Sequence, residues 1–346
     1  MNRARRQQQL FAELAAKYGP EVAEAFFLAI EDIRSGVELQ RVIALLENGD
    51  IEGALQALHI ELQAFQRMAE KIRQGYQDGG RAAASTLPRR LPDGTALVVR
   101  FDGANPVAEA WISRHSSSLI TRITQEQRQS VRDAMVEGLR RGDNPRQTAL
   151  EIVGRVSRST GQREGGILGL SQQQARFVSA ARDELASADP AKLKHYLTRG
   201  RRDKRFDRSI TKAIREGKPV DPAIAQKAVT AYERRLLQLR GETIGRVETM
   251  TSLQQAKYEA HRQAIASGKV EAHTVTKVWR SSGDFRVRHT HRALNGDSAR
   301  MDETFTSPSG AQMRFPMDTS MGAGVDEIVN CRCDCEYRID FYANLR

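Results

Sequence analysis

Cysteine, aromatic residues and long apolar runs are scarce in this 346-residue sequence. The three cysteines lie within five positions, whereas the cysteines of a disulfide framework are spread along a chain. No apolar run approaches the roughly 20 residues that span a bilayer. The basic N-terminus leads into a stretch with charges inside it, so it lacks the apolar centre of a secretory signal. These absences predict a soluble protein made in the cytoplasm.

Motifs of common enzymes are missing as well. The sequence has no Gly-rich phosphate loop, no Gly-x-Ser-x-Gly and no His-Glu-x-x-His. The segment His289-Thr290-His291, with Asp284 and Asn330, has a faint similarity to a metal-dependent nuclease. However, two histidines two positions apart on a helix point in different directions. We therefore expect no enzyme, with a metal-dependent nuclease as the enzymatic alternative.

Positive charge is unevenly distributed along the chain. The formal net charge is +11, yet residues 268–346 hold eleven Lys/Arg and eleven Asp/Glu, so the surplus lies before them. A basic surplus favours contact with a polyanion, although it also serves solubility. The densest basic stretch supplies six candidate nucleic-acid-binding residues: Arg199, Arg201, Arg202, Lys204, Arg205 and Arg208. Because Phe206 is its only aromatic residue, backbone contact is expected rather than base stacking, and a solvated face or an acidic protein partner is the alternative.

Apolar residues recur at three- and four-residue steps in the first part of the chain, which is typical of amphipathic helices. A break is expected at Gly19-Pro20, since proline disrupts a helix interior. Asn48-Gly49-Asp50 is expected to end one helix and to begin the next. Gly75, Gly79 and Gly80 are expected to end that next helix.

The middle of the chain carries clear helix-start signals. Thr124–Gln127 fits a capping box and predicts a helix that Gly142 closes. Asn144-Pro145 and Asp221-Pro222 each place proline in a first helical turn, where its missing N–H costs nothing. A second long helix is expected from near Glu242.

The last region has a different composition, with more Gly, Pro, Ser and Thr. Val275–Arg280 and Cys331–Ile339 are expected to be strands, and Ser307–Gly310 a hairpin turn. Asp284–Leu294 is expected to be one short helix, closed by Asn295-Gly296. These elements predict a small α+β module.

The fold class expected from these patterns is mainly α-helical in the N-terminal and middle regions, with a small C-terminal α+β module. The expected domains are an N-terminal helical domain at 1–80, an extended connector at 81–103, a helical domain with the basic stretch at 104–268, and the α+β module at 269–346.

Four motifs follow one another in the last region. They are Trp279 with Ser281, Ser282 and Asp284; Arg286, Arg288 and His291; Leu294-Asn295-Gly296; and Asn330-Cys331-Arg332-Cys333. This order resembles the C-terminal domain of the Mu F-like head morphogenesis (minor capsid) family of tailed phages, most clearly over residues 275–340. A weaker similarity lies in Arg246-Val247-Glu248-Thr249. The resemblance makes Trp279, Asp284, Arg286, Arg288 and Asn330 candidates for a structural network.

Part of that family carries a zinc site, and the resemblance implies where its ligands would fall. Arg288 stands where a first cysteine would be, and His291 where a second would be. Ile328 replaces a histidine, while Cys331 and Cys333 remain. The resemblance thus implies zinc on His291, Cys331 and Cys333.

A tetrahedral zinc ion takes four ligands, so a fourth group is needed. His289, Asp284 and Cys335 are the candidates for that position. The alternative is a site that has lost its metal. In that case Arg288 is expected to pair with Asp284 or Glu327, and His291 to be a hydrogen-bonding core residue.

The resemblance implies a minor head protein located in the virion, at the interior of the phage head or its portal vertex. Its expected partners are the portal protein, the major capsid protein or both, and packaged double-stranded DNA, with several copies per head and no membrane. The alternative function is a metal-dependent nuclease or toxin-like effector carried in the head.

Overall fold

The structure is a computed structural model and describes residues 3–92 and 94–343. Within them the chain forms two compact units, each made of separate segments. Unit 1 comprises Met1–Glu24, Arg67–Ser117 and Glu242–Arg346, and unit 2 comprises Ala25–Gln66 and Ser118–Gly241. The sequential division into domains expected from the sequence stays a prediction, and its outermost residues lie outside the described ranges.

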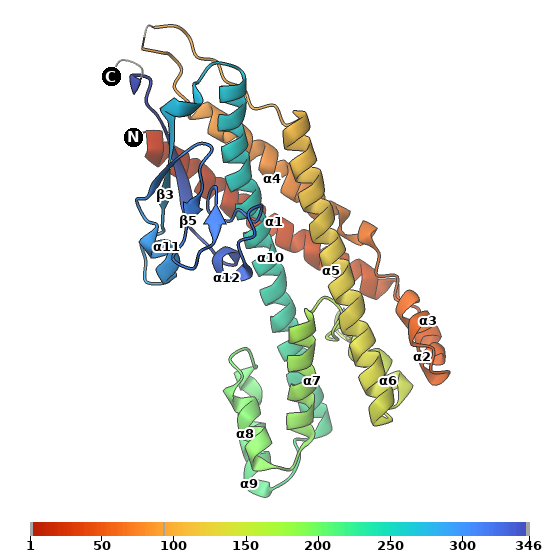
Figure 1. Cartoon of the computed structure of the whole chain (residues 1–346). Helices are drawn as coiled ribbons and strands as arrows, with labels where there is room; N and C mark the ends of the chain where they lie inside the picture. Colours follow the sequence, from red (N-terminus) through yellow and green to blue (C-terminus); the bar gives the residue numbers. More distant parts are fainter. Residues whose placement is uncertain (1–2, 93, 344–346) are drawn as a thin grey trace. The chain divides into compact units, whose positions relative to one another are not determined.

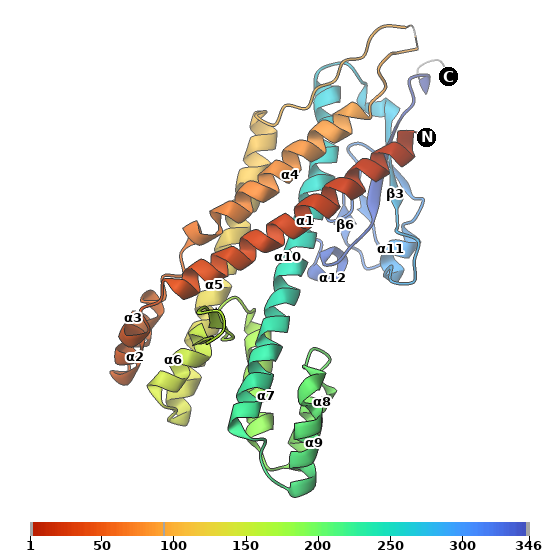
Figure 2. The ribbon, with the colours of Figure 1, turned by 180° about the vertical axis from the view of Figure 1, so that it is seen from behind.

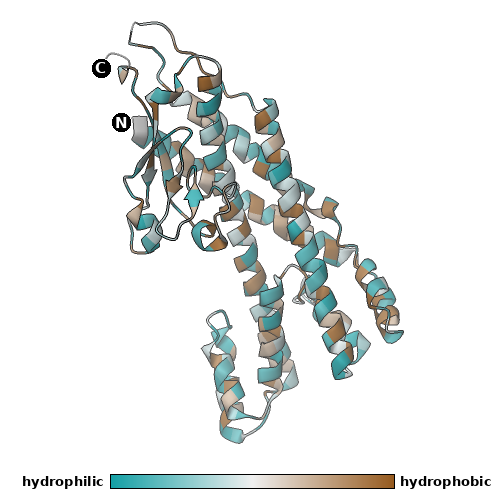
Figure 3. Ribbon diagram, in the orientation of Figure 1, coloured by the Kyte–Doolittle hydropathy of each residue, from teal (hydrophilic) through white to brown (hydrophobic). Residues whose placement is uncertain are grey.

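Helices dominate the described residues, which confirms the expected fold class (Figure 1). The helices up to residue 266 are α1 (Arg3–Ser35), α2 (Leu39–Glu47), α3 (Ile51–Gln56), α4 (Gln66–Ser85), α5 (Pro106–Arg141), α6 (Pro145–Val153), α7 (Gln172–Ala186), α8 (Pro190–Thr198), α9 (Asp207–Glu216) and α10 (Pro222–Ala266). Short 3₁₀ turns occur at Leu62–Phe65, Lys204–Phe206 and Ala272–Thr274, and β1 (Arg155–Val156) pairs with β2 (Arg163–Glu164). Polar residues interrupt the apolar ones along every long helix (Figure 3), and no described helix is long and apolar enough to cross a membrane.

Glycines that the sequence suggested as helix ends lie inside helices, where they allow close packing. In unit 1, a Cβ at Gly79 would come within 2.8 Å of Leu253, and one at Gly80 within 2.4 Å of Phe101. α4 therefore continues to Ser85, and the expectation that these glycines end it was wrong.

Three expected interruptions are absent because the apolar stripes continue through them. α1 runs through Pro20 without a break, although proline in a helix interior costs about 3 kcal/mol. α5 runs through the expected capping box, and Thr124 is buried in mid-helix. α10 is likewise one helix rather than two. The starts of α6 and α10 at their prolines are confirmed.

In unit 1, α1 and α4 lie side by side (Figure 2). The hydroxyl of Tyr18 donates to the carboxylate of Asp78 at 2.6 Å, and Lys71 pairs with Glu21 at 2.9 Å. These contacts fix the register of the two helices.

The C-terminal part of unit 1 is the small α+β module. Its elements are β3 (Val275–Arg280), α11 (His289–Ala293), β4 (Ser298–Arg300), β5 (Phe305–Thr306), β6 (Gln312–Met313), α12 (Val325–Ile328) and β7 (Asp334–Ile339). An antiparallel sheet has the order β4-β3-β7, and β5 and β6 form a separate hairpin. The first expected strand and the hairpin are confirmed, whereas Cys331 and Cys333 precede the last strand, and the expected helix at 284–294 shrinks to α11.

The hydrophobic core of this module includes side chains from α10. Tyr258 and Ala264 belong to the same buried cluster as Trp279 and Phe315. Lys257 is fully buried and its ammonium pairs with Asp334 of β7 at 2.5 Å. The module and the second half of α10 therefore share one core.

Candidate functional site

A buried cluster of two cysteines and one histidine is the main candidate site. His291 of α11 and Cys331 and Cys333 each offer one donor atom, and these atoms all lie within 4.8 Å of one another. The Nδ1 atom of His291 is 3.3 Å from Sγ of Cys331 and 3.5 Å from Sγ of Cys333. The structure thus brings together the three residues that the sequence predicted as ligands.

The two thiols differ in acidity because they are hydrogen-bonded to one another. This bond lowers the pKa of Cys333 against the effect of its burial, and the neighbouring His291 lowers it further. The same bond and burial raise the pKa of Cys331.

Glu327 of α12 lies on the other side of the imidazole. Its Oε2 atom is 2.6 Å from Nε2 of His291, but the two atoms do not form a hydrogen bond. The buried carboxylate accepts hydrogen bonds from Ser309 at 2.6 Å and Thr290 at 3.1 Å. Burial would raise the pKa of Glu327, but the bond from Ser309 and the charge of His291 lower it.

A soft, borderline metal ion such as zinc suits this donor set, because zinc binds thiolate sulfur and imidazole nitrogen. A carboxylate beside the second nitrogen of a ligating histidine is also a common outer-shell arrangement. None of the three expected fourth ligands joins the cluster among the described residues. Asp284 pairs with Arg332 at 2.5 Å, His289 is exposed, and Cys335 is buried in β7 opposite Trp279.

The candidate network residues hold the loops around this cluster. Trp279 is fully buried, and its ring centroid is 5.0 Å from that of His291. Arg288 donates to the main-chain oxygens of Asp326 and Val329. The expectation that Arg288 pairs with Asp284 or Glu327 was therefore wrong: its guanidinium instead caps carbonyls at the end of α12.

Arg246 and Glu248 of α10 also connect to other elements, as expected for residues two apart on a helix. Arg246 donates to the side-chain oxygen of Asn330 at 3.2 Å, and Glu248 pairs with His115 of α5 at 2.8 Å. Asn330 itself has a positive φ of 58°, which asparagine tolerates better than most residues.

The basic stretch of unit 2 divides into two kinds of residue. Arg199, Arg202 and Arg205, the paired arginines, bind Glu184, Asp207 and Asp203 at 2.6, 2.9 and 2.7 Å. Arg201, Lys204 and Arg208, the free cations, are exposed and have no carboxylate partner among the described residues. The sequence alone could not distinguish the paired arginines from the free cations. For example, Glu184, the partner of Arg199, lies fifteen positions before it.

The surplus positive charge extends beyond this stretch. Residues 192–241 hold fifteen Lys/Arg against five Asp/Glu. A surface groove of about 430 Å³ is lined by Arg205, Lys227 and Arg234 with Phe206, against the single acid Glu164. Of the six basic candidates, Arg205 lines this groove, which the sequence did not reveal.

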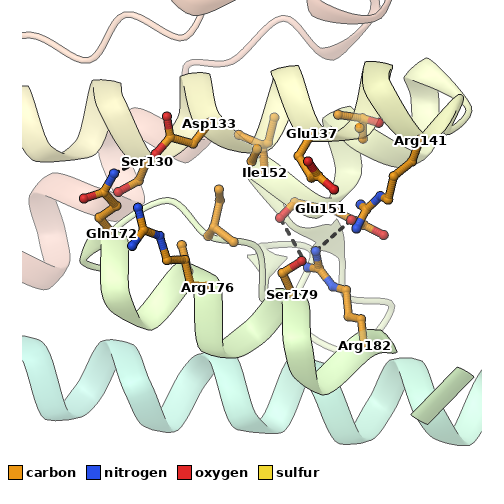
Figure 4. Close-up of a pocket in the computed structure, with 15 residues that line it drawn as sticks. Ser130, Asp133, Glu137, Arg141, Glu151, Ile152, Gln172, Arg176, Ser179 and Arg182 are labelled. Carbon is orange, nitrogen blue, oxygen red and sulfur yellow. Dashed lines mark hydrogen bonds and ion pairs between the residues drawn. The ribbon is translucent and has the colours of Figure 1, made fainter. Parts of the chain in front are cut away.

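A second groove of about 410 Å³ lies in unit 2, between α5 and α7. Figure 4 shows Asp133, Glu137 and Arg141 of α5 facing Gln172, Arg176, Ser179 and Arg182 of α7. Its charges are mostly paired inside the unit, since Arg182 binds Glu151 at 2.7 Å and Glu233 at 2.5 Å. These pairs make it less suited than the basic groove to a polyanion.

Comparison with known proteins agrees with the motifs of the C-terminal module. Residues 197–336 match the family model described as Phage Mu protein F like protein. Minor head protein GP7 of Bacillus phage SPP1 is 28% identical over 138 residues, which cover 38% of this chain and 41% of that protein. No solved structure matches the chain. The matched region begins well before the C-terminal motifs and includes α9, α10 and the whole of the basic stretch. Residues 197–336 are thus a Mu F-like region, as the motifs predicted.

Proposed function

We propose that this protein is a minor component of a phage head that acts during head assembly by binding and placement rather than by catalysis. The observation that carries the proposal is the Mu F-like match over residues 197–336, together with the similarity to a minor head protein. Its partners are the portal protein, the major capsid protein or both, at the portal vertex or the inner face of the shell.

Co-expression tests this proposal. The chain would be produced with the portal and major capsid proteins of its own phage, and assembled shells would be separated by sedimentation. We expect the chain to sediment with shells, with portal assemblies or with both. A chain that stays entirely at the top of the gradient while shells form normally would contradict the proposal.

Contact with packaged DNA is the second part of the proposal. The surface of unit 2 carries both the free cations and the groove lined by Arg205, Lys227 and Arg234. Phosphate neutralisation by such side chains is independent of sequence and strongly dependent on salt. The surface therefore suits the backbone of double-stranded DNA inside a head.

We also propose that His291, Cys331 and Cys333 hold a zinc ion. When bound, zinc would cross-link α11 to the segment before β7, and a water molecule or another non-protein group would complete its coordination. Because all three donors are buried, the proposed role is to stabilise the module.

A further inference from the structure

The two most exposed large apolar side chains of the described residues both belong to the C-terminal module. Phe285 is 85% exposed and Val325 is 78% exposed. Met321, in the loop before α12, is 47% exposed. Isolated apolar residues are common on surfaces, so their significance depends on how they are held and on what surrounds them.

The loop that carries Phe285 is fixed on both sides. The carboxylate of Asp284 accepts two bonds from Arg332, at 2.5 and 2.6 Å, and one from the backbone N–H of Arg286 at 2.9 Å. Val287 is buried. The aromatic ring is therefore presented to solvent by an anchored backbone, which lowers the conformational entropy lost on binding.

Arg288 joins this loop to the one that carries Val325. Its guanidinium donates to the main-chain oxygen of Asp326, directly after Val325, and to that of Val329 at 2.6 Å. The loop that carries Phe285 and the start of α12, which carries Val325, are thus tied together by one side chain. We call residues 284–288 and 321–326 the Phe285 edge.

The charge around this edge is positive on balance, since Arg286, Arg288, Arg292 and Arg332 outnumber Asp284 and the exposed Asp326. The guanidinium of Arg286 lies 5.4 Å from the centre of the Phe285 ring and forms no ion pair with a carboxylate among the described residues, although its charge helps to lower the pKa of Asp284. Arg292 and His289 are exposed on the adjoining α11, while the charge of Asp284 is already neutralised by Arg332. An aromatic side chain beside a free arginine is the composition typical of energetically dominant interface residues.

We propose that the Phe285 edge is a docking surface for another head protein, one with an apolar pocket and an acidic rim. The inference rests on the proposed role as a head component. A protein is favoured over DNA because Val325 and Met321 add aliphatic surface, and because duplex DNA offers no unstacked bases to Phe285. The anchored loops and the buried His291 cluster beneath them hold the edge in its binding shape.

Binding of the full chain to two purified probes tests the proposal: portal assemblies and empty capsid shells of the same phage. Phe285→Ala should weaken binding to one of them by roughly 30-fold or more, as expected for a central interface aromatic. Phe177→Ala, which changes a half-exposed phenylalanine of α7 in unit 2, is the matched control and should bind like wild type. Arg286→Glu should also weaken binding, and the loss should shrink as salt is raised.

Thermal unfolding of each variant shows whether it is folded, and Phe285→Ala should keep the wild-type Tm because its ring is exposed. If wild type binds a probe and Phe285→Ala binds it equally well, the docking surface is wrong while the head-protein role stands. If wild type binds neither probe, both proposals fail. If Phe285→Ala weakens binding to a duplex DNA and not to the proteins, the edge is a DNA contact and the inference is overturned.

Discussion

Replacing His261 by Phe should remove one contribution to the acid sensitivity of unit 1. His261 is buried in α10, its Nδ1 atom lies 2.8 Å from the main-chain oxygen of Lys257, and its ring stacks on Tyr337 of β7 at 4.2 Å. Burial lowers the pKa of His261 to about 4, and the nearby charge of Lys257 adds to the effect. Phenylalanine keeps an aromatic ring for the stack and cannot take up a proton.

The direction of the pH effect on stability depends on how His261 is protonated in the folded and the unfolded chain. A histidine in the unfolded chain titrates near pH 6.5, whereas the folded protein holds His261 neutral down to about pH 4. Between these values the unfolded state binds more protons, so the free energy of unfolding falls as the pH falls. Each pH unit is worth about 1.4 kcal/mol at most, so the full loss is roughly 3 kcal/mol, and the contribution is fully present above pH 6.5.

Denaturant unfolding followed by circular dichroism between pH 7.5 and pH 4.5 measures this effect. The wild type should lose about 2 kcal/mol more than the His261→Phe variant over that interval. The exposed His289 gives the control, since His289→Phe should leave the wild-type slope unchanged. Parallel curves for wild type and His261→Phe would refute the assignment of a buried, neutral histidine.

Three further predictions concern the other features of the chain. Changing the three free cations to Gln should reduce the salt slope of duplex-DNA binding by roughly 2.7, because each lost phosphate contact removes about 0.9. The same change at Arg199 and Arg202, whose ion pairs are largely buried, should mainly lower the Tm. Equal slopes in all three proteins would exclude the free cations from the DNA contact. Changing Cys331 and Cys333 to Ser should abolish the zinc found by elemental analysis in protein purified without chelators, and should lower the Tm; wild type without zinc under those conditions would contradict the metal proposal. A fragment of residues 242–346 should unfold cooperatively at a higher temperature than one of residues 269–346, which lacks Tyr258 and Lys257 of the shared core; equal transitions would favour the domain boundary near residue 268.

Local signals in the sequence predicted local structure well. The prolines after Asn144 and Asp221 mark the true starts of α6 and α10, since proline is tolerated in a first turn whatever lies elsewhere in the fold. Ser307–Gly310 likewise turns between β5 and β6. These signals act within a few residues, so no tertiary information was needed.

The prediction that glycines end the helix at 75–80 was wrong because glycine has two different roles in helices. A glycine that ends a helix and one that lets two helices approach look the same in the sequence. Gly79 and Gly80 belong to the second kind, and their close neighbours Leu253 and Phe101 are distant along the chain. The helix start expected at Thr124 was also wrong. Burial of the continuous apolar stripe of α5 outweighs the local capping signal.

The candidate site was predicted in part. The histidine and the two cysteines could be found because the order of motifs resembled a known family. The position of Glu327 beside His291 could not be predicted from the sequence. Ser309 and Thr290 reach the Glu327 carboxylate only after the β5–β6 hairpin and α11 pack together. The exposed Phe285 could not be distinguished from a core phenylalanine without the structure.

We propose that this protein is a structural component of a phage head. Quantitative mass spectrometry of purified, DNA-filled heads tests it most directly, with portal protein as the internal standard for copy number. The account predicts peptides of this chain at a small, reproducible number of copies per head. Abundant protein in infected cells with none in purified heads would contradict it.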